Sequence, residues 1–122
     1  LPAFTGMLQT MTINKNRMRQ AAAGGFTNAT DLADYLVIKG LPFREAHHIS
    51  GQLVHYCLAQ NTVLEDLGLA FLQEACPLFE EDVYEAISLN ACVNRRNLAG
   101  GPAPEAVKSA IVTSRKRLAN YR

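Results

Sequence analysis

The residues best suited to chemistry are a glutamate and three histidines in one segment of the sequence. Glu45 and His48 form a Glu-x-x-His step, His47 lies between them, and His55 follows seven residues after His48. On a helix, such a step places a carboxylate and an imidazole on one face, as in di-iron carboxylate bundles. That site needs a second Glu-x-x-His and two further glutamates, and an i, i+7 histidine pair is too widely spaced to chelate one ion. We therefore expect structural histidines, with no metal or other cofactor.

The three cysteines are the other candidate nucleophiles, since a thiol beside His47 or His48 is a familiar catalytic pair. Cys57, Cys76 and Cys92 each lie at or near an apolar stripe, where cysteine behaves as a small hydrophobic residue. Their odd number and the lack of C-x-x-C spacing favour reduced thiols over disulfides or a zinc site. We predict buried thiols in an intracellular, cytoplasmic protein.

Three further patterns have simpler structural interpretations. The acidic run at residues 80–82 (EED) suits the dipole of a helix N-terminus better than acid–base catalysis. The pair Gly100-Gly101 lacks the lysine and hydroxyl residue of a phosphate loop and is interpreted as a turn. The basic cluster at residues 115–117 (RKR) suits a helix C-terminus.

The composition excludes several partners. Of the 122 residues, 48% are hydrophobic and 19% charged, and the formal net charge is +1. That charge creates no field that would attract nucleic acid, and the second helix of a possible helix-turn-helix around Gly40-Leu41-Pro42 carries few basic residues beyond Arg44. No apolar run approaches the about 18 residues that span a membrane, and no signal peptide is recognisable. We expect a folded protein that binds neither nucleic acid nor membrane.

Helical periodicity and termination signals predict an all-α chain. An apolar stripe from Leu1 to Ala22 predicts one long helix that ends at Gly24-Gly25 and has apolar groups on more than one face. The chain is expected to begin inside this helix. Gly51 inside a later helix suggests that another backbone approaches closely. The other predicted helices cover residues 30–39, 42–60, a short helix from the capping box 62–65 (TVLE), a Phe79-Val83-Ile87 stripe, a turn from Ser88 to about 95–96, and a final helix from Pro104 to Tyr121.

Several ordered motifs resemble the C-terminal domain of argininosuccinate lyase, and the resemblance covers nearly the whole chain. Departures are small: Ser50 and Gln52 replace bulkier apolar and basic residues, and Pro102 replaces a common threonine. The motifs are residues 28–37 (NATDLADYLV), 39–48 (KGLPFREAHH), Gly51, 64–67 (LEDL), 77–84 (PLFEEDVY) and 100–104 (GGPAP).

The resemblance implies a member of the fumarase and aspartase superfamily that cleaves argininosuccinate into arginine and fumarate, the last step of arginine biosynthesis. The family is a homotetramer whose active sites use a serine on a mobile loop, Ser-Ser-x-Met-Pro-x-Lys-x-Asn-Pro, and a histidine elsewhere. Neither that loop nor the family's substrate-binding stretch occurs in the 122 residues. We therefore predict no catalytic residue in this chain and no activity of the chain alone.

The resemblance also implies a division of the chain. Residues 1–25 are expected to be the end of a long central-bundle helix, and residues 26–122 a small multi-helix C-terminal domain. That domain borders the catalytic cleft in the family, so Arg44, His47 and His48 are candidate cleft-bordering residues. The alternative hypothesis is a stand-alone helical module that assembles through the apolar faces of residues 1–23.

Overall fold

The structure is a computed structural model that describes residues 2–121, so Leu1, where the predicted first stripe begins, lies outside the described residues. Within residues 2–121 the chain has helices and no strand, which confirms the predicted all-α class. The elements are α1 (Pro2–Thr10), α2 (Lys15–Ala23), α3 (Ala29–Ile38), α4 (Phe43–Gln60), the 3₁₀ helix η1 (Leu64–Asp66), α5 (Leu69–Ala75), α6 (Val83–Ala86), α7 (Leu89–Arg95) and α8 (Pro104–Ala119).

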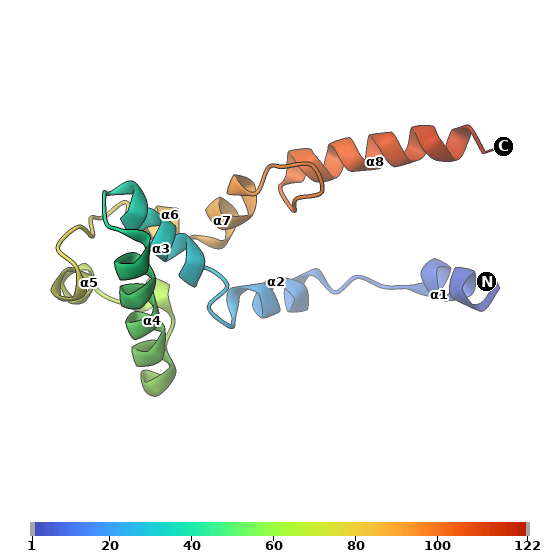
Figure 1. Cartoon of the computed structure of the whole chain (residues 1–122). Coiled ribbons are helices and arrows are strands. Elements are labelled where there is room, and N and C mark those ends of the chain that lie inside the picture. The colour runs from blue at the N-terminus through green and yellow to red at the C-terminus, as the bar shows by residue number, and fades with distance from the viewer. Residues whose placement is uncertain (1, 122) are drawn as a thin grey trace.

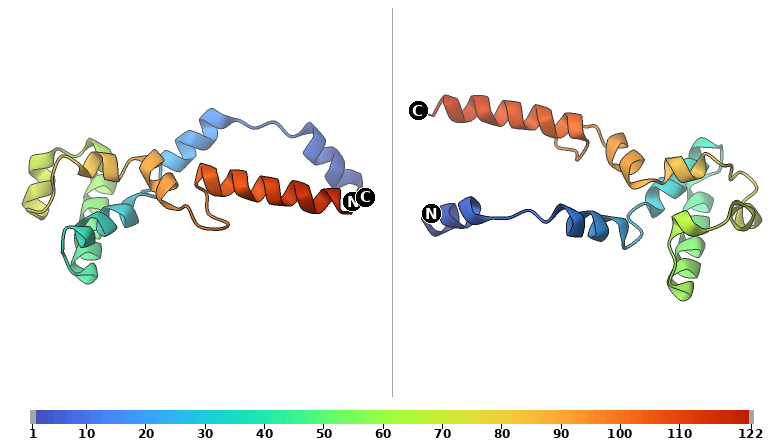
Figure 2. Two further views of the ribbon diagram at one scale, coloured as in Figure 1. Left: turned by 90° about the horizontal axis from the view of Figure 1, so that it is seen from above. Right: turned by 180° about the vertical axis from the view of Figure 1, so that it is seen from behind.

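The helices form a body and two arms. Helices α3 to α6 with η1 make the body, while α1 and α2 form one arm and α8 forms the other (Figure 1). Both arms leave the same side of the body, and the two termini lie at their far ends, as the views from above and behind also show (Figure 2). None of the residues of α1, α2 or α8 is buried. The core therefore belongs to the body.

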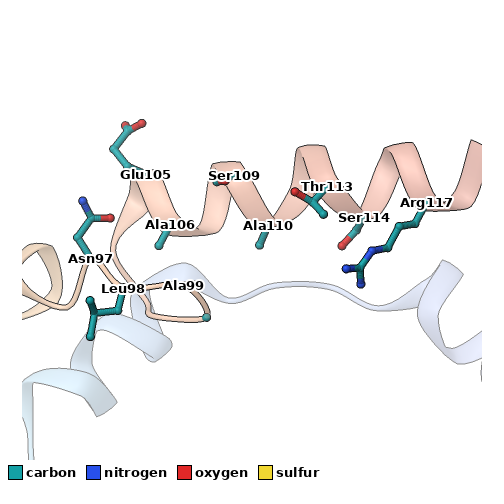
Figure 3. Close-up of a pocket in the computed structure, with 11 residues that line it drawn as sticks. Asn97, Leu98, Ala99, Glu105, Ala106, Ser109, Ala110, Thr113, Ser114 and Arg117 are labelled. Carbon is teal, nitrogen blue, oxygen red and sulfur yellow. The ribbon is translucent and has the colours of Figure 1, made fainter.

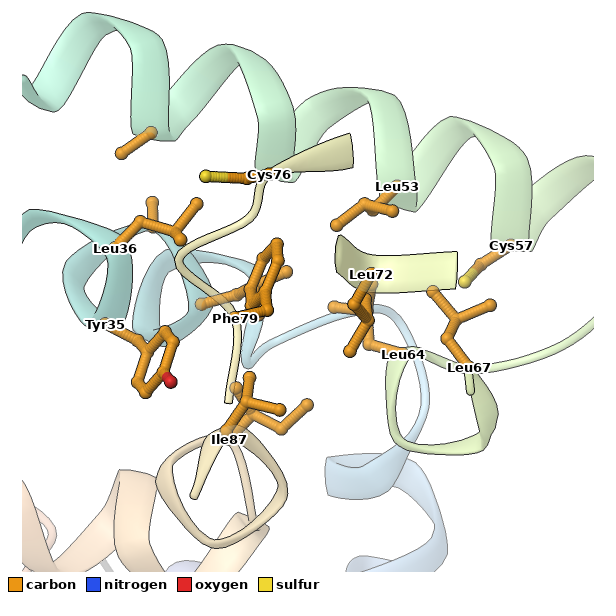
Figure 4. Packing of buried hydrophobic residues seen from close by; sticks show 14 residues of the cluster. Tyr35, Leu36, Leu53, Cys57, Leu64, Leu67, Leu72, Cys76, Phe79 and Ile87 are labelled. Atoms are coloured by element: carbon orange, nitrogen blue, oxygen red, sulfur yellow. The ribbon is translucent and has the colours of Figure 1, made fainter. Parts of the chain in front are cut away.

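The core forms because apolar residues recur at helical spacing on the facing sides of α3 and α4. Leu32 and Leu36 of α3 are fully buried, and α4 contributes Ala46, Leu53 and Cys57. Phe79, Val83 and Ile87 are also fully buried, as their four-residue spacing predicted, although α6 is only four residues long. Figure 4 shows Phe79 at the centre of this cluster, between α3, α4 and η1; its ring stacks on Tyr35 with centroids 5.9 Å apart.

The prediction of one unbroken helix at the N-terminus is wrong. Residues 11–14 are not helical and separate α1 from α2. The β-branched Thr10, Thr12 and Ile13 are poor helix formers, and Asn14 caps α2 by accepting a hydrogen bond from the Arg17 backbone N–H at 3.0 Å. The apolar stripe, which Lys15 interrupts, has Met11 inside the break and resumes at Met18 after it, so its periodicity did not reveal the break.

Other predicted helix ends are confirmed. Asn61 ends α4 in the left-handed conformation with φ 51°, and Gly40 follows α3 with φ 103°. The Ser88 hydroxyl accepts from the Ala91 N–H at 3.2 Å and so caps α7, while Pro104 opens α8. The final helix thus begins where the sequence predicts.

The predicted capping box at Thr62 and Glu65 is absent. Val63 occupies the N-cap of η1 without a side-chain cap bond. The Glu65 carboxylate instead accepts from the Asn28 amide at 2.8 Å, and the same amide donates to the Ile87 carbonyl at 3.1 Å. Asn28 at the start of α3 thus bonds to two distant segments rather than capping its own helix.

The close backbone approach predicted at Gly51 is also wrong for the described residues. A Cβ built at Gly51 would have no neighbour within 4 Å, and the residue is exposed on α4. The loss of helix stability caused by this glycine is therefore not offset by packing within residues 2–121.

Replacing this glycine should stabilise the chain. We expect Gly51→Ala to raise the free energy of unfolding by about 1 kcal/mol, because alanine has the better helix propensity and open space receives its methyl group. Urea unfolding followed by circular dichroism measures the change. Gln52→Ala, at the exposed neighbouring position, is the matched control and should change stability by less than about 0.5 kcal/mol. A Gly51→Ala variant less stable than the parent would contradict the open geometry.

Candidate functional site

The predicted cleft-bordering residues lie on the outer face of α4. Arg44, His47 and His48 are all exposed, whereas Ala46 and Ser50 face the body. The helix is held in this orientation by its buried side and by the Ser50 hydroxyl, which donates to the Ala29 carbonyl of α3 at 2.7 Å. The three histidines of α4 are thus surface groups.

The exposed side chains of α4 surround a shallow depression. His47, His48 and His55 line it together with Gln52, and Gly51 forms its floor because it has no side chain. His55 thus shares a surface with His48, as the seven-residue spacing predicted. The first-turn residue Phe43 is 59% exposed and lies against His47 with ring centroids 5.9 Å apart.

The described residues contain no group of three or more histidines, cysteines or carboxylates placed to hold a metal ion. Glu45 and His48 both lie on the exposed side of α4, so the Glu-x-x-His step is not directed into a bundle interior. The positions of these residues provide no inward-facing ligand set of the di-iron type.

The cysteines are poor nucleophiles in this structure. All three are free and buried, as predicted. Burial, reinforced by the negative charges of Glu65 and Asp66, raises the pKa of the Cys57 thiol. Burial and the hydrogen bond to Asp31 raise the pKa of Cys92 to about 11. Because the thiolate is the reactive form, Cys57 and Cys92 are held as unreactive thiols near neutral pH.

A buried carboxylate, which the sequence did not single out, joins α3 to the end of α7. Asp31 is 2% exposed, and its two oxygens accept from the Arg96 guanidinium at 3.1 and 2.9 Å. Arg95 donates to the same carboxylate at 3.2 Å and to the Ala86 carbonyl at 2.6 Å. We call Asp31, Arg95 and Arg96 the α3–α7 clamp. Sequence periodicity could not find it, because the partners are 64 and 65 residues apart.

Opposing effects act on the clamp carboxylate. Burial alone raises the pKa of Asp31, but hydrogen bonds from Arg96 and Cys92 and the charges of Arg96 and Arg95 together outweigh it. The net result is a pKa below the usual range of an aspartate. Asp31 is therefore an ionised group held in the interior, as a buried charge with paired partners can be.

A second polar cluster joins the end of α3 to the segment before α6. Lys39 donates to Glu80 at 2.9 Å and lies 3.1 Å from an Asp82 oxygen. The Tyr35 hydroxyl donates to Asp82 at 2.5 Å and accepts from the Glu80 backbone N–H at 3.1 Å. Glu80 and Asp82, which were predicted to stabilise a helix N-terminus through its dipole, thus form tertiary contacts. Hydrogen bonds with Glu80 and Asp82 raise the pKa of Lys39, and hydrogen bonds from Tyr35 and Lys39 lower the pKa of Asp82.

A groove runs from the turn at residues 97–100 along α8 as far as Arg117 (Figure 3). Small and hydroxyl side chains of α8 line one wall, and Leu98 and Asn97 line the other. Figure 3 shows Arg117 at the far end and Glu105 pointing away from the groove. The residues that line this groove include no histidine, cysteine or converging acid pair. The groove is therefore a concave surface without a converging group of catalytic side chains.

Taken together, these surfaces present one exposed polar helix face and polar clusters that connect elements. No helix in the described part of the chain is both long and apolar enough to cross a membrane. Several exposed apolar side chains lie on the arms, including Phe4, Met7 and Met18, and others lie on the body, including Ile38 and Leu58.

Known proteins show the same arrangement. The structure superposes on EDDS lyase in complex with formate with a TM-score of 0.85 and 34% identity, covering 97% of this chain and 26% of that one. A variant of EDDS lyase with bound fumarate gives the same values. The fold is thus that of a C-terminal lyase domain.

Sequence comparison identifies the family. The family described as argininosuccinate lyase C-terminal matches residues 26–94. The argininosuccinate lyases of Desulforamulus reducens and Pelotomaculum thermopropionicum are 54% and 56% identical over 118 residues, which cover 97% of this chain. That of a Clostridium botulinum strain is 58% identical over 91% of the chain. The chain belongs to the argininosuccinate lyase family and corresponds to its C-terminal segment. It spans about a quarter, 26%, of the length of the first two relatives.

Proposed function

We propose that this chain is the C-terminal, non-catalytic portion of an argininosuccinate lyase. The observation that supports the proposal is the match over 118 residues to enzymes of that name. The reaction breaks the bond between a guanidinium nitrogen and a succinate carbon as a proton leaves the neighbouring carbon. The products are arginine and fumarate, so the enzyme performs the last step of arginine biosynthesis.

The chain's own residues support a positioning role. No serine loop of the family type occurs between residues 1 and 122, and the clusters described above connect elements rather than converge on a substrate. We propose that residues 1–25 end a central bundle and residues 26–122 form the terminal helical domain. The match to residues 26–94 supports the start of that domain.

We propose that the two arms mediate assembly of the enzyme. Phe4, Met7 and Leu8 of α1 are 60, 69 and 53% exposed, and Leu118 of α8 is 68% exposed. Side chains of this kind are normally covered in a soluble enzyme, and a homotetramer with a shared helical bundle would cover them. A cytoplasmic location, without nucleic-acid or membrane partners, accords with three free buried cysteines and a net charge of +1.

The isolated chain is expected to be inactive. We predict no fumarate release above background when the purified 122 residues are mixed with argininosuccinate, as followed by ultraviolet absorbance of fumarate. The complete reading frame that contains this chain should release fumarate as a tetramer. A correctly assembled tetramer without turnover would refute the proposed activity, whereas turnover by the 122 residues alone would refute the non-catalytic role.

The outer face of α4 is proposed to border the substrate cleft through Arg44, His47 and His48. In the complete enzyme, we predict that His48→Ala lowers kcat/KM by about tenfold, because misplacement at a cleft edge weakens substrate alignment. His55→Ala, two turns away on the same face, is the matched control and should change kcat/KM by less than about twofold. Equal effects of the two substitutions would contradict a cleft edge at the start of α4.

A further inference from the structure

Within the described residues 2–121, packing against the body does not fix the direction of helix α8. The helix buries none of its residues, and it has no extensive packing contact with another helix in residues 2–121. Figure 1 shows α7 between the body and α8, so whatever holds α7 also directs the C-terminal arm. The connection from α7 through residues 96–103 is thus the part of the structure that sets the orientation of the arm.

The first fixed point of this connection is the α3–α7 clamp. Arg96, which directly follows α7, binds both oxygens of Asp31, and its guanidinium also donates to the Cys92 carbonyl one turn earlier. Arg95 links Asp31 to the Ala86 carbonyl of α6. A bidentate arginine–carboxylate pair restrains direction as well as distance. The end of α7 is therefore oriented against α3 and α6 by ionic hydrogen bonds.

The second fixed point is a tight turn at Gly101. A Cβ at this position would overlap the carbonyl oxygen of Arg96 and lie 3.0 Å from that of Leu98. The Gly101 N–H also donates to the Leu98 carbonyl at 2.8 Å, and Ala103, at the start of α8, is 2% exposed. Figure 3 shows this turn folding back beneath the first residues of α8. The turn thus packs directly on the backbone of a clamp residue.

We propose that the α3–α7 clamp and the Gly101 turn together fix the orientation of α8 relative to the body. Asp31 is the anchor because it is buried in α3, within the body core. Arg96 is the shared element, since its side chain belongs to the clamp and its carbonyl oxygen supports the turn. Within residues 2–121, the orientation of the arm thus depends on the Asp31–Arg96 ion pair. This inference does not rest on the proposed activity.

The test measures the distribution of distances between the body and the arm. Spin labels are attached at Ile38→Cys in α3 and Leu118→Cys in α8, which are 80% and 68% exposed, while the native cysteines are buried. Pulsed electron paramagnetic resonance on the 122-residue chain should give a narrow distribution. We expect Asp31→Asn to broaden that distribution at least about twofold, because an amide cannot form the ion pair. Asp34→Asn, on the exposed side of the same helix, is the matched control and should leave it narrow.

Two further variants keep the test decisive if Asp31→Asn disturbs folding. Arg96→Gln removes the clamp charge from a side chain that is 43% exposed, and Gly101→Ala disturbs the turn without touching the clamp side chains. Both should broaden the distribution while hydrogen exchange shows α3 and α4 still protected. A narrow distribution in Arg96→Gln and Gly101→Ala with a protected body would overturn the proposal. Loss of protection in α3 and α4 together with α8 in every variant would also overturn it, because the broader distribution would then come from unfolding of the body and not from a released arm.

Discussion

Replacing Phe79 by alanine is expected to lower the free energy of unfolding by about 3–5 kcal/mol, the usual cost of removing a buried aromatic ring. The ring is fully buried, it stacks on Tyr35 at 5.9 Å, and it lies between α3, α4 and η1. Its removal leaves a cavity at the point where three parts of the body meet. Because a domain of this size has only about 5–15 kcal/mol of stability, the variant should be partly unfolded near 37 °C. Denaturant unfolding followed by circular dichroism gives the change.

The matched control is Phe43→Ala. Phe43 is 59% exposed at the start of α4 and makes its ring contact with His47 on the surface. Its removal should cost less than about 1 kcal/mol, since little apolar area is returned to water. If the two substitutions destabilised the chain equally, Phe79 would not be the centre of the core.

The second large effect is expected from Asp31→Asn, which should lower the free energy of unfolding by about 2 kcal/mol at pH 7. Hydrogen bonds between charged groups contribute about 1.5–3 kcal/mol, and a value within that range is expected because Arg95 and Arg96 remain partly solvated. Asp34→Asn is again the exposed control and should change stability by less than about 0.5 kcal/mol.

The same carboxylate predicts a dependence on pH. The folded-state pKa of Asp31 is lowered, because the hydrogen bonds and charges of its partners outweigh the effect of burial. Its contribution to stability is therefore present above the unfolded pKa of about 4 and is lost as the pH falls through the lower folded value. The difference in stability between the parent and Asp31→Asn should thus shrink below about pH 4. A difference that stays constant from pH 7 to pH 3 would contradict an ionised clamp.

Much of the fold could be predicted from local signals. Asn61, Ser88 and Pro104 mark helix ends at the positions where the structure has them, because each acts through its own backbone or its immediate neighbours. The burial of Phe79, Val83 and Ile87 was also predicted by their spacing. These features depend on a few adjacent residues, which a sequence displays directly.

The failures involve competition between local and distant partners. Glu65 was expected to complete a capping box, but it bonds to Asn28, 37 residues away. The acidic run was expected to favour a helix dipole, but Asp82 and Glu80 bond to Tyr35 and Lys39. The break at residues 11–14 was hidden because the apolar stripe has Met11 inside it and resumes at Met18. Periodicity shows which residues are apolar, but it does not show which distant group reaches a polar one.

The candidate site was accessible to prediction only in part. The sequence placed His48 and His55 on one face, and the structure brings them to one depression. It could not show that this face is exposed, since an amphipathic helix with histidines on one side suits either a core or a cleft. The clamp at Asp31 was missed because its arginine partners are more than 60 residues away.

The most direct test of the central claim is a segment exchange in a related enzyme. The matching 118-residue segment of the Desulforamulus reducens argininosuccinate lyase is replaced by this chain, which is 54% identical to it, and fumarate release from argininosuccinate is measured. We expect an assembled chimera whose kcat/KM lies within about tenfold of the parent enzyme, since the exchanged segment positions the site without supplying its catalytic groups. An assembled chimera that released no fumarate would contradict it.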